Sequence, residues 1–101
     1  MSSPLLSVHV FVAWRGPTYV ALCLELGVAA SGETAEAAIA QLEQAVAAFV
    51  ESRTALGIDI SEEYEPLSED ALAEYRREVE AGARLLEYQL LPPEPRWSPV
   101  G

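Results

Sequence analysis

Residues 19–36 read "YVALCLELGVAASGETAE" and decide the fold, because the hydrophobic period changes within them. Residues 19–26 form an apolar run typical of a strand, with Val20, Leu22, Leu24 and Leu26 on one face and Tyr19, Ala21, Cys23 and Glu25 on the other. Gly27 breaks this run, and residues 28–31 are long enough for a further short strand. Thr34 is then a good helix N-cap. The stretch predicts a strand, a turn, a second strand and the start of a helix.

The segment before this stretch predicts another strand, "SVHVFVAW" at residues 7–14. Its alternation places one set of side chains on one face of the strand, namely Val8, Val10, Val12 and Trp14. "RGPT" at residues 15–18 supplies glycine and proline for a hairpin turn. Residues 7–14, 19–26 and 28–31 therefore predict a three-stranded antiparallel meander.

After the meander the period becomes helical. An alanine-rich helix is predicted from Thr34 until Gly57, which is a natural stop. "GIDI" at residues 57–60 predicts a short fourth strand, and Ser68 caps a second helix that Pro92 ends. The predicted fold is α+β, in the order β-β-β-α-β-α, with both helices on one side of the sheet. The residues predicted to support this core are Val10, Val12, Leu22, Leu24, Ile39, Leu42, Val46 and Phe49.

The length of 101 residues predicts one domain. Residues 1–60 form its β-β-β-α-β core, and residues 61–101 add an acidic loop, the second helix and a proline-rich tail. No apolar run reaches the roughly 18 residues of a membrane span. The first residues lack the basic region of a signal peptide, and a single cysteine excludes an internal disulfide. We therefore expect a cytoplasmic protein.

The charge is strongly one-sided. Sixteen acidic residues face six arginines, and no lysine is present, so the formal net charge is -10. Nucleic-acid binding depends largely on neutralising phosphates, so the chain alone is not expected to bind nucleic acid. A basic protein would be attracted and steered towards this surface. Acidity that serves only solubility is the alternative explanation.

Residues 19–51 resemble the HicB family of antitoxin-like proteins. The resemblance consists of a tyrosine-led strand with a Cys-x-Glu-Leu element, a glycine turn and a Thr-capped helix that ends near Phe-Val-Glu. The matching positions are Cys23, Glu25, Leu26, Gly32, Thr34, Glu36, Ala37, Ile39, Leu42 and Ala45. The family also has a proline after the cysteine and a Pro-Gly-Cys element after the leucine, where this chain has Leu24 and "GVAAS".

The resemblance implies a partial ribonuclease-H-like fold and the neutralisation of a small basic RNA-cleaving toxin, HicA, by protein–protein occlusion. Full-length members add a DNA-binding unit, but residues 61–101 offer only an acidic helix and a tail, which phosphate would repel. From charge and expected exposure, we predict partner-binding residues that comprise one aromatic anchor and five acids: Tyr19, Glu25, Glu33, Glu62, Glu63 and Glu65.

Catalysis is not expected. Cys23 and His9 lie on matching faces of neighbouring predicted strands, which leaves a reactive thiol or a small-ligand site open. A small half-buried hydrophobe is the favoured explanation for Cys23, because Glu25 nearby disfavours the thiolate. Glu25 and Asp59 are the only acids on the predicted strands, too few for a two-metal nuclease. We therefore predict no enzyme activity, no metal and no cofactor.

The main alternative is a solitary structural or regulatory homo-oligomer without a toxin. If both helices cover one face of the sheet, the other face exposes an apolar patch of Phe11, Tyr19, Ala21 and Cys23, which favours self-association. Cover by the second helix is the competing possibility. Arg76 and Arg77 are expected to pair with nearby glutamates such as Glu74 and Glu80.

Overall fold

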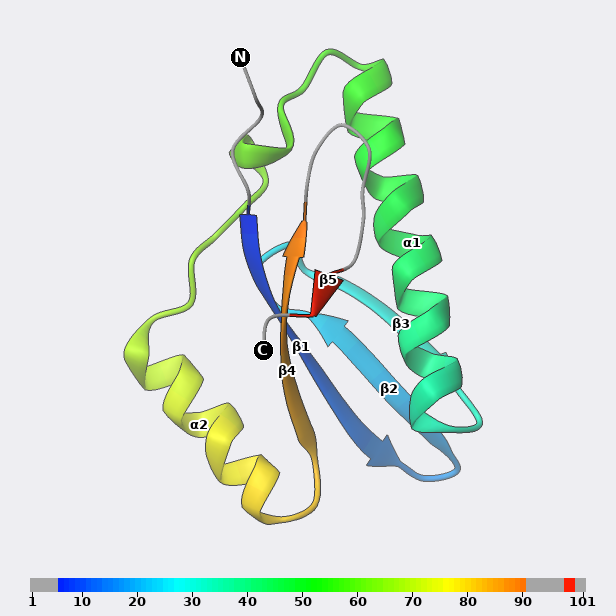
Figure 1. Cartoon of the computed structure of the whole chain (residues 1–101), viewed down its shortest axis with the longest axis vertical. Helices are drawn as coiled ribbons and strands as arrows, with labels where there is room; N and C mark the ends of the chain where they lie inside the picture. Colours follow the sequence, from blue (N-terminus) through cyan, green and yellow to red (C-terminus); the bar gives the residue numbers. More distant parts are fainter. Residues whose placement is uncertain (1–5, 91–97, 100–101) are drawn as a thin grey trace.

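The computed structural model describes residues 6–90 and 98–99. It confirms the α+β class, with an antiparallel sheet, one long helix packed on it and a second helix (Figure 1). The order of the strands in the sheet is β3-β2-β1-β4-β5. The elements are β1 (Leu6–Arg15), β2 (Thr18–Cys23), β3 (Val28–Gly32), α1 (Ala35–Ala55), the 3₁₀ turn η1 (Ile60–Glu62), α2 (Glu69–Glu80), β4 (Arg84–Leu90) and β5 (Ser98–Pro99).

The meander and α1 form where the sequence predicts them. Thr34 caps α1, since its hydroxyl accepts a hydrogen bond from the Ala37 N–H at 3.0 Å. Gly57 follows the last turn with a φ of 76°, a left-handed conformation that glycine adopts without strain. Within residues 6–90 and 98–99, no helix is long and apolar enough to cross a membrane.

The core lies between α1 and one face of the sheet. Val10 and Val12 on β1 and Leu42 and Val46 on α1 are buried there, as predicted. Ile39 and Phe49, also predicted, are partly buried and pack against the same cluster.

The predicted orientation of β2 is wrong. Leu22 and Leu24 are only half-buried, and Ala21 and Cys23 occupy the core instead. The pairing explains this, because Val10 stands opposite Cys23 and Val12 opposite Ala21, and directly paired residues share a face. Both faces of β2 are apolar, so its alternation did not identify the inner one.

The predicted fourth strand at 57–60 is also wrong. This segment leads into η1, where Asp59 accepts hydrogen bonds from the N–H and the hydroxyl of Ser61 at 2.9 and 2.8 Å. Ile60 is buried in the core, which accounts for its apolar character. The fourth strand is instead β4, which pairs with the side of β1 away from β2 and comes from a region predicted to be helical. Gly82, with a φ of 112°, follows α2 and separates it from β4.

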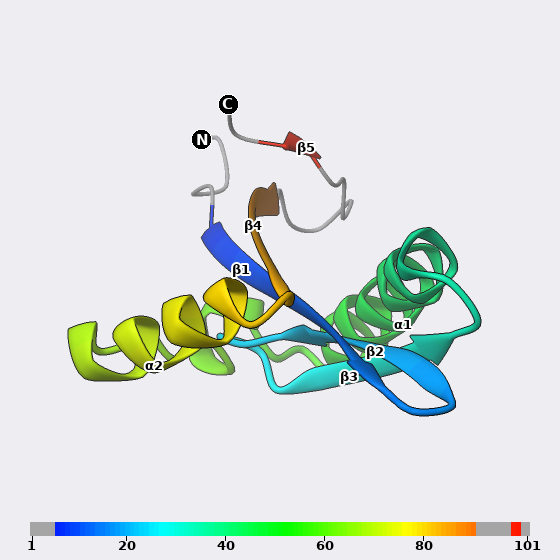
Figure 2. The same cartoon turned by 90° about the horizontal axis from the view of Figure 1, so that it is seen from below.

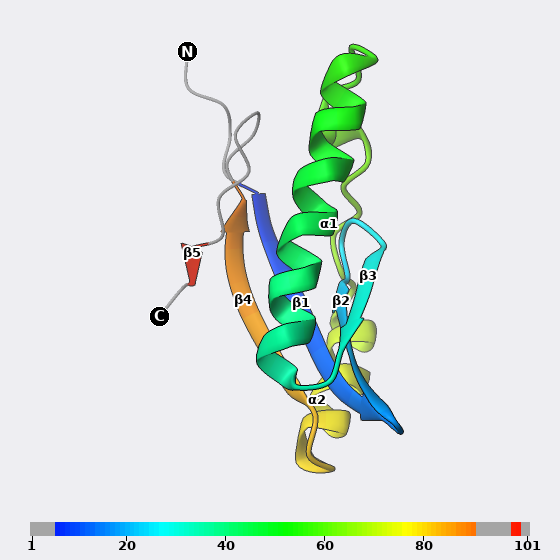
Figure 3. The ribbon, with the colours of Figure 1, turned by 90° about the vertical axis from the view of Figure 1, so that its right-hand side faces the viewer.

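The two helices lie on opposite sides of the sheet, not on one side as predicted (Figures 2 and 3). Phe11 packs against Tyr75 of α2, with their ring centroids 4.9 Å apart. Phe11 is consequently buried, although α2 itself has no buried residue. The apolar patch expected to drive self-association therefore does not form: Tyr19, Ala21 and Cys23 lie on the α1 side of the sheet, and Phe11 is covered by α2. We call this side of the sheet, which carries His9 and Phe11, the outer face.

Gly32 marks the closest approach of β3 to α1. A Cβ atom added there would lie 2.6 Å from the Ala38 nitrogen and 2.8 Å from the Ala37 carbonyl carbon. These are backbone atoms, so the helix itself must move. We expect Gly32→Ala to lower the free energy of unfolding by about 3 kcal/mol, as overpacking of a rigid site does. Urea denaturation measures this, and Ser31→Ala, at an exposed neighbouring position, is the control. Equal stabilities of the two variants would contradict the close approach.

Candidate functional site

Glu25 is the one buried charged residue in the part of the chain that the structure describes. It sits in the four-residue turn between β2 and β3, after Cys23 and Val28 form their last cross-strand pair. Its carboxylate accepts a hydrogen bond from the backbone N–H of His9 on β1 at 2.7 Å. A carboxylate withdrawn from water needs such donors, because an unpaired buried charge is strongly unfavourable.

The His9 side chain supplies the second donor and links Glu25 to a further carboxylate. Its Nδ1 lies 2.6 Å from Glu25 Oε2, and its Nε2 lies 3.1 Å from Glu87 Oε1. Each ring nitrogen thus lies within hydrogen-bond distance of a carboxylate oxygen, to which it donates when it carries a proton. The three residues come from the β2–β3 turn, β1 and β4, where His9 and Glu87 are directly paired. We call them the Glu25–His9–Glu87 network.

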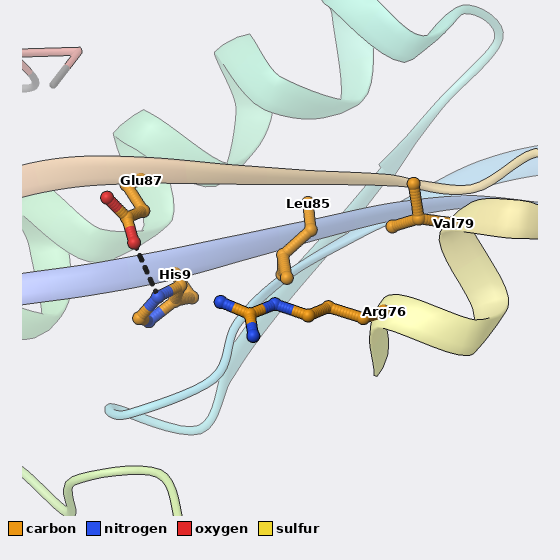
Figure 4. A pocket seen from close by; sticks show the side chains of 5 residues that line it. All are labelled: His9, Arg76, Val79, Leu85 and Glu87. Atoms are coloured by element: carbon orange, nitrogen blue, oxygen red, sulfur yellow. Dashed lines mark hydrogen bonds and ion pairs between the residues drawn. The ribbon is translucent and has the colours of Figure 1, made fainter. Parts of the chain in front are cut away.

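A pocket opens beside this network on the outer face (Figure 4). Its volume is about 410 Å³, in the lower part of the range typical of ligand sites. Side chains of β1, β4 and α2 surround it, and we call it the outer-face pocket. Its lining residues are His9, Arg76, Val79, Leu85 and Glu87.

Arg76 also has surroundings that differ from those predicted. Neither Arg76 nor Arg77 forms a hydrogen bond or an ion pair within the described residues, so the expected pairing with Glu74 and Glu80 is absent. The guanidinium of Arg76 extends from α2 towards His9 across the pocket (Figure 4). It therefore remains available to an external anion.

Two of the predicted partner-binding residues are placed differently from expectation. Glu25 is only 3% exposed and is occupied by His9, so it does not present its carboxylate to a partner. Tyr19 lies on the α1 side of the sheet, opposite Trp14 in the hairpin, with the two rings 4.9 Å apart. Half of Trp14 is exposed, so this aromatic pair, rather than Tyr19 alone, reaches the surface.

The remaining four predicted residues fall into two separate groups. Glu33 is exposed, just before α1 and at the end of β3. Glu62 and Glu65 are exposed in the loop at residues 61–65, which follows the other end of α1. Glu63 pairs there with Arg53, with 3.0 Å between Oε1 and Nε. Since α1 has 21 residues and is about 30 Å long, no single small contact surface includes both groups.

The acidic loop at residues 61–65 is held against the sheet. The Glu65 N–H donates to the Glu25 carbonyl oxygen at 2.9 Å, and the Tyr64 hydroxyl donates to the Ser7 carbonyl oxygen at 2.6 Å. The β2–β3 turn therefore has two roles: its buried carboxylate binds His9, and its backbone anchors the loop. Glu25 therefore stabilises the position of the acidic loop.

Cys23 does not form a site with His9. Cys23 is fully buried on the α1 side, opposite Val10, whereas His9 is on the outer face. Burial raises the pKa of the Cys23 thiol to about 12; a hydrogen bond from the Leu26 backbone partly opposes this effect, and the neighbouring Glu25 carboxylate adds a smaller upward contribution. A thiol in this state is a poor nucleophile at neutral pH.

Sequence reasoning missed the Glu25–His9–Glu87 network and the outer-face pocket. Residues 84–90 were predicted to be helical, so Glu87 was not expected to stand opposite His9. The available signals were a single histidine in an apolar strand and one acid in an otherwise apolar hairpin. Those residues indicate a polar contact, but only the pairing of β4 with β1 completes it.

Comparisons with known proteins do not assign the chain to a family. No protein-family model matches it, and no curated protein or solved structure matches it at a significant level. Its role is therefore inferred from its own residues, their charge and their packing.

Proposed function

We propose that this chain is a HicB-like, antitoxin-type module that binds and neutralises a small basic RNA-cleaving toxin by protein–protein occlusion. The observation that carries the proposal is the formal net charge of -10, which arises from sixteen acids against six arginines. The resemblance of residues 19–51 to the HicB family supports a basic toxin as the partner, whose charge is opposite to that of this chain. The proposed role is binding, not catalysis.

The acidic loop at residues 61–65 is the favoured contact region. Glu62 and Glu65 are exposed there and have no ion pair within the described residues. The bonds of Tyr64 and the Glu65 backbone fix the loop before a partner arrives. A fixed arrangement favours affinity, because little further ordering is needed on binding. Glu33, at the far end of α1, would contact only a partner that extends along the helix.

Occlusion follows from the chemistry of the proposed partner. An enzyme that cleaves RNA needs positive charge to hold phosphates. An acidic protein surface binds the same positively charged residues and therefore competes with RNA for them. Electrostatic complementarity of this kind speeds association and excludes wrong partners, and it weakens as salt is added.

Charge reversal in the loop tests this proposal. We expect Glu62→Lys/Glu65→Lys to weaken binding of the basic protein that copurifies with the chain by at least about tenfold at low salt. The difference should shrink as ionic strength rises, which calorimetry at several salt concentrations measures. Glu74→Lys/Glu80→Lys on α2 is the control, since it makes the same change in net charge elsewhere.

Equal weakening by both double variants would mean that only the total charge matters and would contradict the loop as the contact region. Failure of the native chain to recover any small basic protein would contradict the antitoxin role itself.

A solitary homo-oligomer is the second candidate, and one observation favours it. β3 is at the edge of the sheet, and the neighbouring β2 residues Val20 and Leu22 are only half-buried on the outer face. An unpaired strand edge beside apolar side chains is a surface on which a second copy can pair. Light scattering on the isolated chain distinguishes the candidates: a stable oligomer without a basic partner favours this one.

A further inference from the structure

The outer-face pocket presents two ionic groups of opposite charge. Glu87 and Arg76 both line it, the first from β4 and the second from α2 (Figure 4). No ion pair joins the two residues in the part of the chain that the structure describes. Each group is therefore able to bind a ligand charge of its own.

Glu87 is positioned by the chain itself. Its Oε1 lies 3.1 Å from His9 Nε2, which leaves Oε2 as an acceptor for a donor in the pocket. His9 is in turn fixed by the buried Glu25, at 2.6 Å from Nδ1. A ligand-binding carboxylate supported in this way by buried neighbours keeps its geometry before the ligand arrives. This gives the buried charge of Glu25 a use beyond the stability of the turn.

Arg76 supplies the complementary group. Its guanidinium has no partner among the described residues and extends towards the imidazole of His9. A guanidinium binds a carboxylate through two parallel hydrogen bonds, so a carboxylate is a suitable anion for Arg76.

The rest of the lining is apolar. Val79 is 38% exposed, although it is a large aliphatic side chain, and Leu85 is half-buried beside it. We propose that the outer-face pocket binds a free α-amino acid with an apolar side chain. Its carboxylate pairs with Arg76, its ammonium group with Glu87, and its side chain covers Val79 and Leu85. A ligand with a single charge would pair with only one of Arg76 and Glu87 and would leave the other without a ligand group of opposite charge.

Calorimetry on the full chain with three matched ligands tests this inference. The ligands are L-leucine, 4-methylpentanoate, which lacks the ammonium group, and 3-methylbutylamine, which lacks the carboxylate. We expect L-leucine to bind, and each of the other two to bind at least about tenfold more weakly. Glycine should also bind more weakly, because it has no side chain to cover the apolar wall.

Two pairs of variants locate the site. Arg76→Ala should weaken L-leucine binding at least about tenfold, and Arg77→Ala, which changes an arginine that does not line the pocket, should not. Glu87→Gln should weaken it similarly, with Glu80→Gln as its control. All four positions are exposed, so the variants are expected to fold, which circular dichroism checks.

The inference is overturned if L-leucine does not bind at millimolar concentration, or if 4-methylpentanoate or 3-methylbutylamine binds as tightly as L-leucine. It is also overturned if Arg77→Ala reduces binding as much as Arg76→Ala. None of these measurements involves a protein partner, so the inference stands or fails independently of the proposed antitoxin role.

Discussion

Glu25→Ala should lower the free energy of unfolding by about 4 kcal/mol, because two donors of His9 lose their acceptor at a buried site and each such loss costs about 1–3 kcal/mol. The carboxylate accepts from both the backbone N–H and the Nδ1 of His9, at 2.7 and 2.6 Å. Both donors lose their acceptor in the variant, at a site where Glu25 is only 3% exposed. Urea denaturation followed by circular dichroism measures the change.

Glu87→Ala is the matched control, because Glu87 bonds to the other nitrogen of the same imidazole. Its side chain is 57% exposed, so water replaces the lost contact and the expected cost is below about 1 kcal/mol. The Glu25–His9–Glu87 network would be energetically unimportant if the two alanine variants were equally stable. A double variant with His9→Ala separates the pair from its surroundings, since the coupling between Glu25 and His9 should be a large part of the effect.

Cys23 should be alkylated about a thousandfold more slowly in the folded protein than in urea at pH 8, because so little of the buried thiol is ionised. Its pKa is raised from 9.0 to about 12, chiefly by burial. Iodoacetamide labelling followed by mass spectrometry measures both rates on the single cysteine of the chain.

The pH dependence of the labelling gives an independent check. In urea the rate should level off about one pH unit above the ordinary thiol pKa of 9.0, where the exposed thiol is almost fully ionised. In the folded protein it should keep rising towards pH 12, because the folded pKa is the higher one. A raised folded pKa also means that the thiol favours the folded state below pH 9 and loses this contribution as pH rises from 9 to 12. Fast labelling of the folded protein at pH 8 would restore Cys23 as a candidate nucleophile.

The predictions from sequence succeeded where the signal was local. Thr34 and Gly57 bracket α1 as expected, because a side-chain cap and a left-handed glycine act within one turn of the helix. Ser68 likewise caps α2, with its hydroxyl 3.1 Å from the Ala71 nitrogen. The hairpin between β1 and β2 also forms where predicted, around Gly16 and Pro17, because turn residues act locally as well.

The predictions failed where a distant segment decided the outcome. Residues 84–90 contain leucines at spacings that suit both a helix and a strand, and pairing with β1 selects the strand. The inward face of β2 was also ambiguous, because Leu22 and Cys23 are both apolar. Packing against α1 determines which face of β2 is buried, and the sequence of β2 alone does not contain this information.

The candidate site was the least predictable part, because three separate segments build it. His9 and Glu25 are 16 positions apart, and His9 and Glu87 are 78 positions apart. Of the predicted contact residues, the exposed acids of the loop at residues 61–65 keep their proposed role. Glu25 instead becomes a support for that loop and for His9.

The central place of β1 sets an order of events during synthesis. β1 pairs with β2 on one side and with β4 on the other, and β4 leaves the ribosome long after β1, β2, β3 and α1. Domains begin to fold while the chain is still growing, so β1 spends this interval with one edge open. An open edge of alternating valines is a template for pairing between nascent chains. Truncated chains that stop before Arg84 should therefore be prone to aggregation, and the arrival of β4 is the step that ends this exposure.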